Sequence, residues 1–319
     1  MNERLKSFLI GLCEAGLVVT LLFSVATAFN EWHQYLELFS HFRMQYFVVS
    51  VLLTLVFVFL KWRNYILLGL ATIAVNAWFV VPWYLPTDAP DPSDADVRLL
   101  HVNLYVGNSD TDRLLSLVDD VDPDLLFLQE FTPDWQAAIE PLTSSYPYRV
   151  VEVRDDPFGI GLYSKYPLDA ITVIESAPLG NPEIVATALV GGERLNIIST
   201  HPMIPLGTSN YFNRNLQLDG VADLARRSPR PLIVVGDLNI TMWAHHYHRL
   251  EEESGLSNAR RGFGIGPTWP AWLFPGLIPI DHVLVSDDLV VTEFTAGPNI
   301  GSDHLPIVVK FTFAEETDE

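Results

Sequence analysis

The pattern of hydrophobic and polar positions divides the chain into an apolar N-terminal part and a longer part of mixed character. Between Phe8 and Leu85, three apolar runs follow one another with few charged residues. A helix needs about 20 apolar residues to cross the hydrocarbon core of a bilayer, and the second run is only marginally long enough. We expect residues 1–85 to form a membrane anchor of three transmembrane helices, at about 8–29, 44–60 and 64–85.

Two alternatives compete for this region. The first run contains Ala26–Thr27–Ala28, which resembles the cleavage site of a signal peptide. That run is longer than the apolar region of most signal peptides, however, and two more runs follow it. The runs could also be buried helices of a soluble core, but three of them in succession with almost no charge favour the membrane.

Lysine and arginine predict the orientation of the anchor. Arg4 and Lys6 precede the first run, and Lys61 and Arg63 lie between the second and third. Positive residues favour the cytoplasmic side of a membrane, so both segments are expected there. An odd number of spans then places the rest of the chain outside. We expect a multi-pass protein of the cytoplasmic (inner) membrane with an extracytoplasmic C-terminal domain.

The remainder of the chain reads as a folded domain between two polar segments. Residues 86–96 (PTDAPDPSDAD) predict an extended linker, residues 97–313 the domain, and residues 314–319 an acidic tail. Hairpins mixed with helical crossovers indicate a mixed sheet. Strands are expected at 97–104, 124–128, 148–153, 159–164, 171–175, 184–190, 195–200, 232–235, 278–285, 289–294 and 306–313, and helices at 110–118, 132–139, 210–226 and 242–253.

Composition adds a constraint on partners. The 319 residues carry a net charge of −20, with a mean hydropathy of +0.22. All of the negative charge lies after Thr87, because the preceding residues hold nearly equal numbers of acidic and basic side chains. Such a surface repels polyanions and argues against tight non-specific binding of nucleic acid. Cys13 is the only cysteine, which excludes a disulfide framework and a cysteine-based metal site.

Polar side chains recur where the predicted strands of the domain end. The run PLIVVGDLN places Asp237 and Asn239 two residues apart, so that their side chains leave the strand on the same side. One such pair is ordinary for a turn, but a series of them indicates a site at one edge of the sheet. The residues at or beside strand ends are Asn103, Glu130, His201, Asp237, Asn239, Asp281, Asp303 and His304.

These residues resemble the motifs of the endonuclease/exonuclease/phosphatase superfamily of metal-dependent phosphoesterases. The matching motifs follow the order of that superfamily over about residues 97–313, and the anchor before them resembles a membrane-anchored bacterial branch. The resemblance implies an α/β (α+β) four-layer sandwich of two mixed β-sheets flanked by helices. The motifs are Asn103, Gln129–Glu130, Thr200–Pro202 (THP), Gly236–Asn239 (GDLN), Ile280–His282 (IDH) and Ser302–Pro306 (SDHLP).

The resemblance also implies a cofactor and its ligands. Glu130 is expected to be the principal ligand of Mg²⁺ or Mn²⁺, because both ions prefer oxygen donors. Asn103 would support the metal, water or phosphate, and Asp303 would take part in metal binding or position its neighbours. Read alone, Asn103 is a strand-end turn residue and Glu130 an acidic residue at a helix start.

The remaining motif residues are expected to act on water and phosphate. The resemblance implies that Asp237 orients or deprotonates the attacking water and that Asn239 holds the phosphate or that water. His304 would donate a hydrogen bond to a phosphoryl oxygen, with Asp281 fixing its tautomer. His201 would contact the phosphate or help the leaving group, although a histidine before proline is also a common loop residue.

Two further residues are candidates for substrate binding. Arg214 could touch a substrate phosphate or pair with one of the many carboxylates. Trp269 belongs to the proline- and tryptophan-rich loop 266–279, which precedes Asp281 and could enter the bilayer or stack on a substrate ring. The sequence does not choose between these two roles for the loop.

Four other histidines are expected to lie outside the site. His282 follows Asp281 directly, so its side chain should point to the opposite face of the strand. His245, His246 and His248 are tempting zinc ligands, but their spacing does not place all three on one helical face.

The sequence therefore predicts a membrane-anchored, Mg²⁺-dependent phosphoesterase that hydrolyses phosphodiester bonds by metal-assisted, in-line attack of water, in the manner of a nuclease. A phospholipid head group or another small phosphodiester is the alternative substrate, favoured by the charge and the anchor. A non-catalytic membrane protein with a partner-binding external domain is an alternative of another class. The expected partners are the phosphodiester and the bilayer, and no protein partner is predicted.

Overall fold

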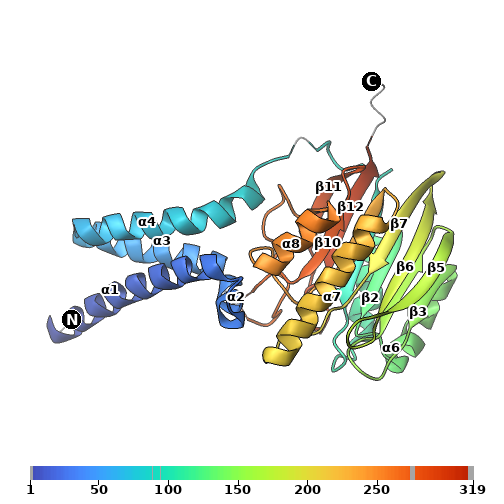
Figure 1. Ribbon diagram of the computed structural model, residues 1–319, viewed down its shortest axis with the longest axis horizontal. Coiled ribbons are helices and arrows are strands. Elements are labelled where there is room, and N and C mark those ends of the chain that lie inside the picture. Colours follow the sequence, from blue (N-terminus) through green and yellow to red (C-terminus); the bar gives the residue numbers. More distant parts are fainter. Residues whose placement is uncertain (1–2, 88, 94, 274–276, 315–319) are drawn as a thin grey trace. The chain divides into compact units, whose positions relative to one another are not determined.

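The computed structural model describes residues 3–87, 89–93, 95–273 and 277–314 (Figure 1). The acidic tail beyond Ala314, Asp88 and Asp94 of the predicted linker, and residues 274–276 of the proline- and tryptophan-rich loop lie outside this range. The chain divides into two compact units, Met1–Leu85 with Trp243–His245 and Pro86–Met242 with His246–Glu319.

The first unit contains three long apolar helices. Each is long and apolar enough to cross a membrane, with spans at Glu3–Phe29, Arg43–Leu60 and Arg63–Tyr84. A short helix, α2, occupies part of the segment expected to be a loop. The elements are α1 (Glu3–Ala26), η1 (Thr27–Phe29), α2 (Gln34–Ser40), α3 (Arg43–Leu60), α4 (Arg63–Val80) and η2 (Val81–Tyr84).

Polar side chains lie between these helices. Asn76 on α4 donates a hydrogen bond to Ser24 Oγ on α1 at 2.8 Å, and Arg43 on α3 donates to Ser24 O at 2.7 Å. All three side chains are buried within the unit. Hydrogen bonds between apolar helices of this kind link neighbours where packing alone gives little specificity.

The second unit is built on two six-stranded sheets (Figure 1). Both are mixed, because β1–β2 and β7–β8 pair in parallel and the other neighbours pair antiparallel. Sheet A has the order β11 (Leu289–Ala296), β12 (Ile307–Phe313), β1 (Val97–Asn103), β2 (Leu125–Gln129), β4 (Ile160–Ser164), β3 (Tyr148–Glu152). Sheet B has the order β5 (Leu168–Ser176), β6 (Asn181–Val190), β7 (Glu193–Ser199), β8 (Leu232–Asp237), β10 (Asp281–Val285), β9 (Ser257–Asn258).

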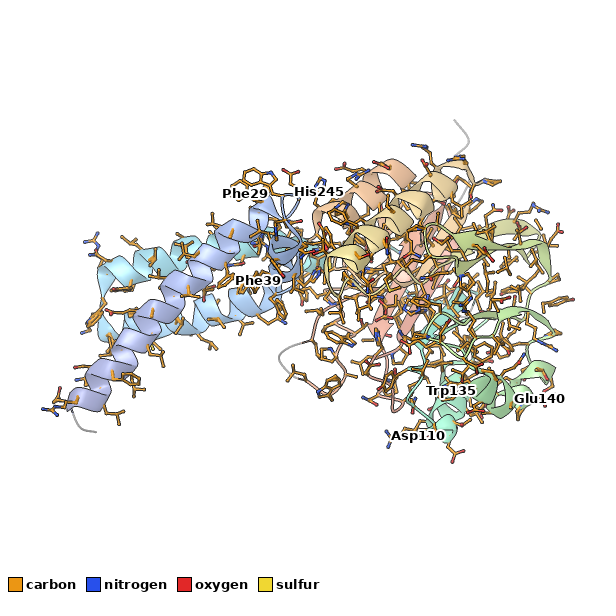
Figure 2. All side chains as sticks on the ribbon, turned by 60° about the horizontal axis from the view of Figure 1, so that its bottom comes forward. Phe29, Phe39, Asp110, Trp135, Glu140 and His245 are labelled. Carbon is orange, nitrogen blue, oxygen red and sulfur yellow. The ribbon has the colours of Figure 1, made fainter. Side chains whose placement is uncertain are left out.

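Alternate residues of the central strands face two different layers. Leu99 and Phe127 from sheet A pack with Ile233 and Val235 from sheet B in one core between the sheets. Leu100 and Leu126 instead face a second core on the outside of sheet A. The helices of that outer core are α5 (Thr111–Val121) and α6 (Pro133–Ala138), whose Trp135 belongs to it (Figure 2).

Two helices accompany sheet B. The crossover from β7 to the parallel strand β8 contains α7, and the segment between β8 and β9 contains α8 (Figure 1). Two sheets with helices outside them confirm the predicted four-layer sandwich. The helices are α7 (Thr208–Arg227) and α8 (His245–Ser254), and the 3₁₀ turn Glu140–Ser144 follows α6.

Several boundaries differ from those expected. The strand predicted from residue 278 begins only at Asp281, because Pro279 has no N–H to donate to the ladder. Ile278 instead forms an isolated bridge with Trp269. The helix predicted from residue 242 begins at His245, and the two-residue strand β9 was not predicted.

Candidate active site

The topology brings the polar strand ends of both sheets to one edge. Parallel pairs β1–β2 and β7–β8 each end at this edge, and β10 begins there, with Asp281 opposite Asp237. Along the central strands, every second side chain faces the core between the two sheets, and the polar residues at the strand ends continue this pattern. On each of four strands, a polar residue lies two positions from a core residue and shares its face. The polar residues are His101 after Leu99, Gln129 after Phe127, Asp237 after Val235 and Asp281 before Val283.

Asp237 lies at the centre of this group. Its Oδ2 is 3.3 Å from Asn103 Nδ2, 3.5 Å from His201 Nε2 and 3.6 Å from His304 Nε2. All four side chains are buried. The structure thus brings together four predicted site residues from strand ends and adjoining loops of both sheets: Asn103, His201, Asp237 and His304. What each does in the reaction remains a prediction.

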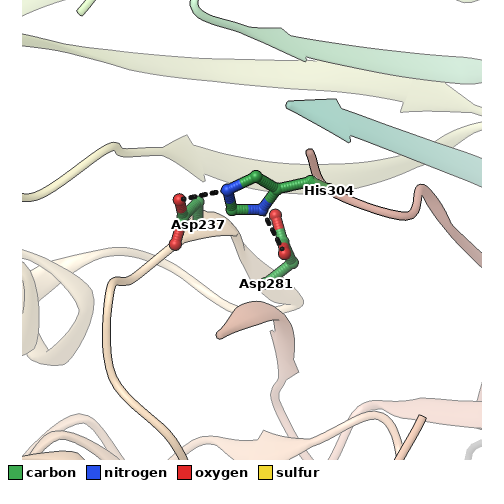
Figure 3. A group of neighbouring side chains, drawn as sticks. All are labelled: Asp237, Asp281 and His304. Atoms are coloured by element: carbon green, nitrogen blue, oxygen red, sulfur yellow. Dashed lines mark hydrogen bonds and ion pairs between the residues drawn. The ribbon is translucent and has the colours of Figure 1, made fainter. Parts of the chain in front are cut away.

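His304 is held between two carboxylates (Figure 3). Its Nδ1 is 2.8 Å from Asp281 Oδ2, and its Nε2 faces Asp237. Burial alone would lower the pKa of His304, but the charges of Asp281 and Asp237 outweigh it and raise the pKa to about 10. The same pairing, against the effect of burial, holds the pKa of Asp281 well below its ordinary value. The pair is therefore an imidazolium and a carboxylate at neutral pH.

The second oxygen of Asp281 contacts a residue that the sequence analysis did not select. His101 Nε2 lies 3.0 Å from Asp281 Oδ1, and the histidine is fully buried in β1. With Asp281 ionised, the nitrogen that faces it donates a hydrogen bond. The available signal was its position, because His101 and Asn103 are two residues apart on one extended strand and share a face.

Gln129 joins the two sheets at the site. Its side-chain amide donates to Thr200 O at 2.7 Å and accepts from the backbone N–H of Asp237 at 2.8 Å. Gly236 permits this close approach, since a Cβ atom there would lie 1.9 Å from Thr200 O. The glycine of the GDLN motif therefore has a steric reason that is independent of the chemistry.

Glu130 follows Gln129 in the chain and has an unusual backbone conformation, which sets the direction of its side chain. Its φ is 55°, in the left-handed region that non-glycine residues seldom adopt. Its Oε2 accepts a hydrogen bond from Val106 N–H at 2.8 Å. Burial raises the pKa of the Glu130 carboxyl, while His201, Val106 N–H and Asn103 oppose that rise. Because a nearby cation favours the ionised form, this half-buried carboxylate suits a metal ligand.

His201 lies between the two acidic residues. Burial lowers the pKa of His201, but the hydrogen bond and charge of Asp237, together with the charge of Glu130, raise it above the ordinary value. Among the described residues its buried Nδ1 has no hydrogen-bond partner, and its ring centroid lies 5.6 Å from that of Phe158. The imidazole therefore has a free donor or acceptor position beside the carboxylates.

Asn239 and Arg214 form a support beneath Asp237. Asn239 also has a positive φ of 52°; its N–H donates to Asp237 Oδ1 at 2.9 Å, and its Nδ2 donates to Pro202 O at 3.0 Å. Arg214, fully buried on α7, donates to Asn239 O at 2.8 Å. In this conformation both side chains stabilise the turn after β8. Direct contact of either with phosphate remains a prediction.

Asp303 is directed toward Trp269. Trp269 Nε1 donates to Asp303 Oδ2 at 3.2 Å, and the backbone N–H of Ala271 donates to Asp303 O at 2.7 Å. Asp303 Oδ1 is buried and has no hydrogen-bond partner in the part of the chain that the structure describes. The pair fastens the proline- and tryptophan-rich loop to the segment that carries His304.

The sequence profile of the endonuclease/exonuclease/phosphatase family matches residues 100–304, which spans nearly all the residues of this site. The chain belongs to the endonuclease/exonuclease/phosphatase family. Its enzyme class follows from that membership: it is a metal-dependent hydrolase of phosphoester bonds. No curated protein sequence matches the chain.

Solved structures of the same family share the fold at low sequence identity. TDP2 from D. rerio, in complex with a single-strand DNA product, is 17% identical with a TM-score of 0.59, over 69% of this chain and 100% of that one. A family protein from Beutenbergia cavernae is 20% identical with a TM-score of 0.58, over 69% and 72%. The catalytic domain of human Nocturnin, with a bound sulfate anion, is 20% identical with a TM-score of 0.55, over 71% and 97%.

Two sets of donor groups in this family member could hold a metal. Among the described residues, only Asp237, Asp281 and His304 place three acidic or histidine donor atoms within 4.8 Å of one another. His304 Nδ1 and Asp281 Oδ2 already face each other at 2.8 Å, however, so two of these donor atoms are paired with one another. Glu130 and Asn103 offer oxygen donors, which suits Mg²⁺ or Mn²⁺, ions that keep several waters and need few protein ligands.

His282 contacts the protein interior and not the site. His282 Nε2 lies 2.8 Å from Ile240 O, and its Nδ1 lies 2.9 Å from Asn258 Nδ2, away from Asp281. Burial and the charge of Arg260 hold the pKa of His282 well below its ordinary value. Within the part of the chain that the structure describes, the clustered metal donors include none of His245, His246 and His248.

Proposed function

We propose that this protein is a multi-pass membrane enzyme whose second unit hydrolyses phosphodiester bonds with Mg²⁺ or Mn²⁺. One observation carries the proposal: Asn103, His201 and His304 converge within 3.6 Å of a single carboxylate, Asp237, beside the half-buried Glu130. Strand-end turn residues with no shared role would have no reason to meet in this way from two sheets.

Glu130 would be the principal metal ligand, with Asn103 in support and Asp303 positioning its neighbours. The bound ion would neutralise charge on the phosphate and lower the pKa of a coordinated water. Asp303 Oδ1, which has no partner among the described residues, would be an oxygen donor beside His304, but the other oxygen of Asp303 accepts a hydrogen bond from Trp269.

The chain's own groups would position and protonate the reactants. Asp237 would accept a hydrogen bond from the attacking water. The N–H of Asn239, which donates to Asp237 Oδ1, would hold the carboxylate in the orientation needed. His304, protonated through its contacts with Asp281 and Asp237, would donate to a phosphoryl oxygen as negative charge builds there. His201 would use its free nitrogen to contact the phosphate or the leaving oxygen.

The substrate is proposed to be a phosphodiester. Two kinds of phosphodiester are candidates, a phospholipid head group first and a nucleic acid second. A relative of the same fold, D. rerio TDP2, is described in complex with a single-strand DNA product. Against this candidate stands the net charge of −20, which opposes the approach of a polyanion. A phospholipid head group carries the same kind of bond without that repulsion.

The three apolar helices would anchor the enzyme in the cytoplasmic membrane, with the second unit on the extracytoplasmic side. The length and composition of the helices support the anchor. The positions of Arg4, Lys6, Lys61 and Arg63 support the orientation.

The test is hydrolysis by the full chain in detergent with Mg²⁺ or Mn²⁺, using bis-(p-nitrophenyl) phosphate, plasmid DNA and phosphatidylcholine vesicles. Asp237→Asn should reduce turnover by about 10²–10⁴-fold, the usual contribution of a positioned acid–base group. Asp223→Asn, the same change on the exposed side of α7, is the matched control and should leave turnover unchanged. Absence of both turnover and metal binding would favour a non-catalytic, partner-binding protein instead.

A further inference from the structure

The most exposed apolar side chains of the second unit lie in two segments. Among its described residues, Leu206, Phe212, Leu216, Trp272 and Leu273 are 49–70% exposed. The other exposed large apolar side chains of the unit are only 36–45% exposed. We name the five residues the apolar rim.

Both segments of the apolar rim adjoin the candidate active site. Leu206 belongs to the loop after His201, and Phe212 and Leu216 lie on the first turns of α7. The two helix residues are four apart and share a face, about 200° around the helix from Arg214, which is buried against Asn239. They therefore face solvent on the side opposite the support of Asp237.

The second segment approaches the site through its tryptophans. The ring of Trp272 lies 6.5 Å from that of Trp269, which is hydrogen-bonded to Asp303 beside His304. The rim is thus attached to the site at two points, beyond β7 and before β10.

These segments also lack the charge that dominates the rest of the unit. Residues 262–280 contain no charged side chain, and residues 202–218 contain only Arg214, which is buried. A nucleic-acid surface would need exposed lysine and arginine to neutralise phosphates. An apolar, uncharged rim with an exposed tryptophan instead has the composition of a membrane-interface surface.

We propose that the apolar rim docks on a lipid bilayer, the one that the protein's own helices are proposed to span, and presents the active site to phospholipid head-group phosphodiesters. The inference rests on the proposed membrane enzyme and adds the surface and the substrate class. Only residues 85–96 separate the last helical turn of the anchor from β1, a reach of at most about 40 Å. That short connection keeps a bilayer within reach of the rim. The acidic surface disfavours anionic lipids, so the expected partner is a zwitterionic one.

The docking test needs no turnover. The full chain, with Cys13→Ser removing its only cysteine, carries a single environment-sensitive fluorophore on a cysteine introduced at Leu206 or Phe212. It is reconstituted into phosphatidylcholine vesicles that contain acyl-chain nitroxide quenchers. The matched control is Leu189, an exposed apolar residue at the other end of sheet B, paired with Arg194 at the start of β7.

The probe at Leu206 or Phe212 should show blue-shifted emission and quenching several-fold stronger than the probe at Leu189. Equal quenching at the rim and at Leu189 would overturn the proposal and leave the rim to a protein partner. Because the readout is binding, quenching at the rim without hydrolysis would retain the docking surface while rejecting the enzyme.

A second measurement tests the substrate class. In the double variant Leu206→Ser, Phe212→Ser, turnover of bis-(p-nitrophenyl) phosphate should remain at the wild-type level. Turnover of phosphatidylcholine in vesicles should fall by about tenfold or more, because apolar area buried at the interface provides the attachment. An equal effect on both substrates, or on neither, would contradict the role of the rim in presenting lipid.

Discussion

Asp281 binds two imidazoles at once, and this arrangement fixes the orientation of a carboxylate that would otherwise rotate. His304 occupies one oxygen and His101 the other. Neither contact is available to bulk water, since all three side chains are buried. The consequence at the scale of the residue is that His304 presents Nε2 in one direction, toward Asp237.

His101 should therefore act as a positioning residue. His101→Phe keeps a ring in the same buried place but removes the donor to Asp281, so kcat should fall by about 10–100-fold with little change in KM. His101→Gln, which retains an N–H donor, should recover most of the loss. A fall in KM and kcat together with a lower melting temperature in both variants would indicate a structural role only.

If His304 is the proton donor, its pKa should set the alkaline limit of turnover. Because the pKa is raised to about 10, the imidazolium persists through neutral pH and kcat should decline only as pH rises through about 10. Asp281→Asn removes the largest charge that raises this pKa. His304 then loses its proton at a lower pH, so the alkaline decline should move toward neutrality. Coincident alkaline limbs in the two kcat–pH profiles would exclude His304 as the proton donor.

At the level of helices and strands, the polar residues at strand ends were the main sequence evidence for the position of the site. The strand expected at residues 97–104 and the GDLN turn pointed to the sheets and to the polar edge. His101 was missed because its neighbours are apolar and a lone histidine in a strand gives no signal of its partner. Its role depends on Asp281, which is distant in sequence and is brought close only by pairing within and between the sheets.

Other features depended on contacts that no local pattern reveals. The short helix α2 lies where the segment between two apolar runs is short and polar enough to suggest a loop. Arg214 was expected to meet a phosphate or a carboxylate, and that stays a prediction; its hydrogen bond to the carbonyl of Asn239 was not expected. Burial of a whole arginine follows from the packing of α7 on sheet B, which sequence spacing does not specify.

Gly236 provides a test of how β8 approaches β7. In Gly236→Ala the new Cβ would meet Thr200 O at 1.9 Å and Gln129 Nε2 at 2.7 Å, so the strand must move. Such overpacking costs about 1–3 kcal/mol and should lower the melting temperature by several degrees. The control is Gly220→Ala on α7, where nothing lies within 4 Å and the helix should gain about 0.5–1 kcal/mol. Equal melting temperatures for the two variants would contradict the close approach.

At the scale of the whole molecule, charge and hydrophobicity are divided between the two units. The apolar unit holds five basic and four acidic residues, while the second unit carries a net charge of −21. If the lysine and arginine pattern sets the orientation, protease added outside spheroplasts should degrade the second unit. Protection of that unit until the membrane is dissolved would reverse the proposed topology.

Glu130 is proposed to bind the metal on which phosphodiester hydrolysis depends. The most direct measurement is turnover of bis-(p-nitrophenyl) phosphate by the full chain against Mg²⁺ concentration, for wild type, Glu130→Gln and the exposed control Glu252→Gln. Wild type and Glu252→Gln should show the same saturation with Mg²⁺ and no activity in chelator. Glu130→Gln should need about 100-fold more Mg²⁺ or show no turnover, because it loses the charged ligand. Turnover that persists in chelator, or a Glu130→Gln curve that overlies wild type, would contradict the account.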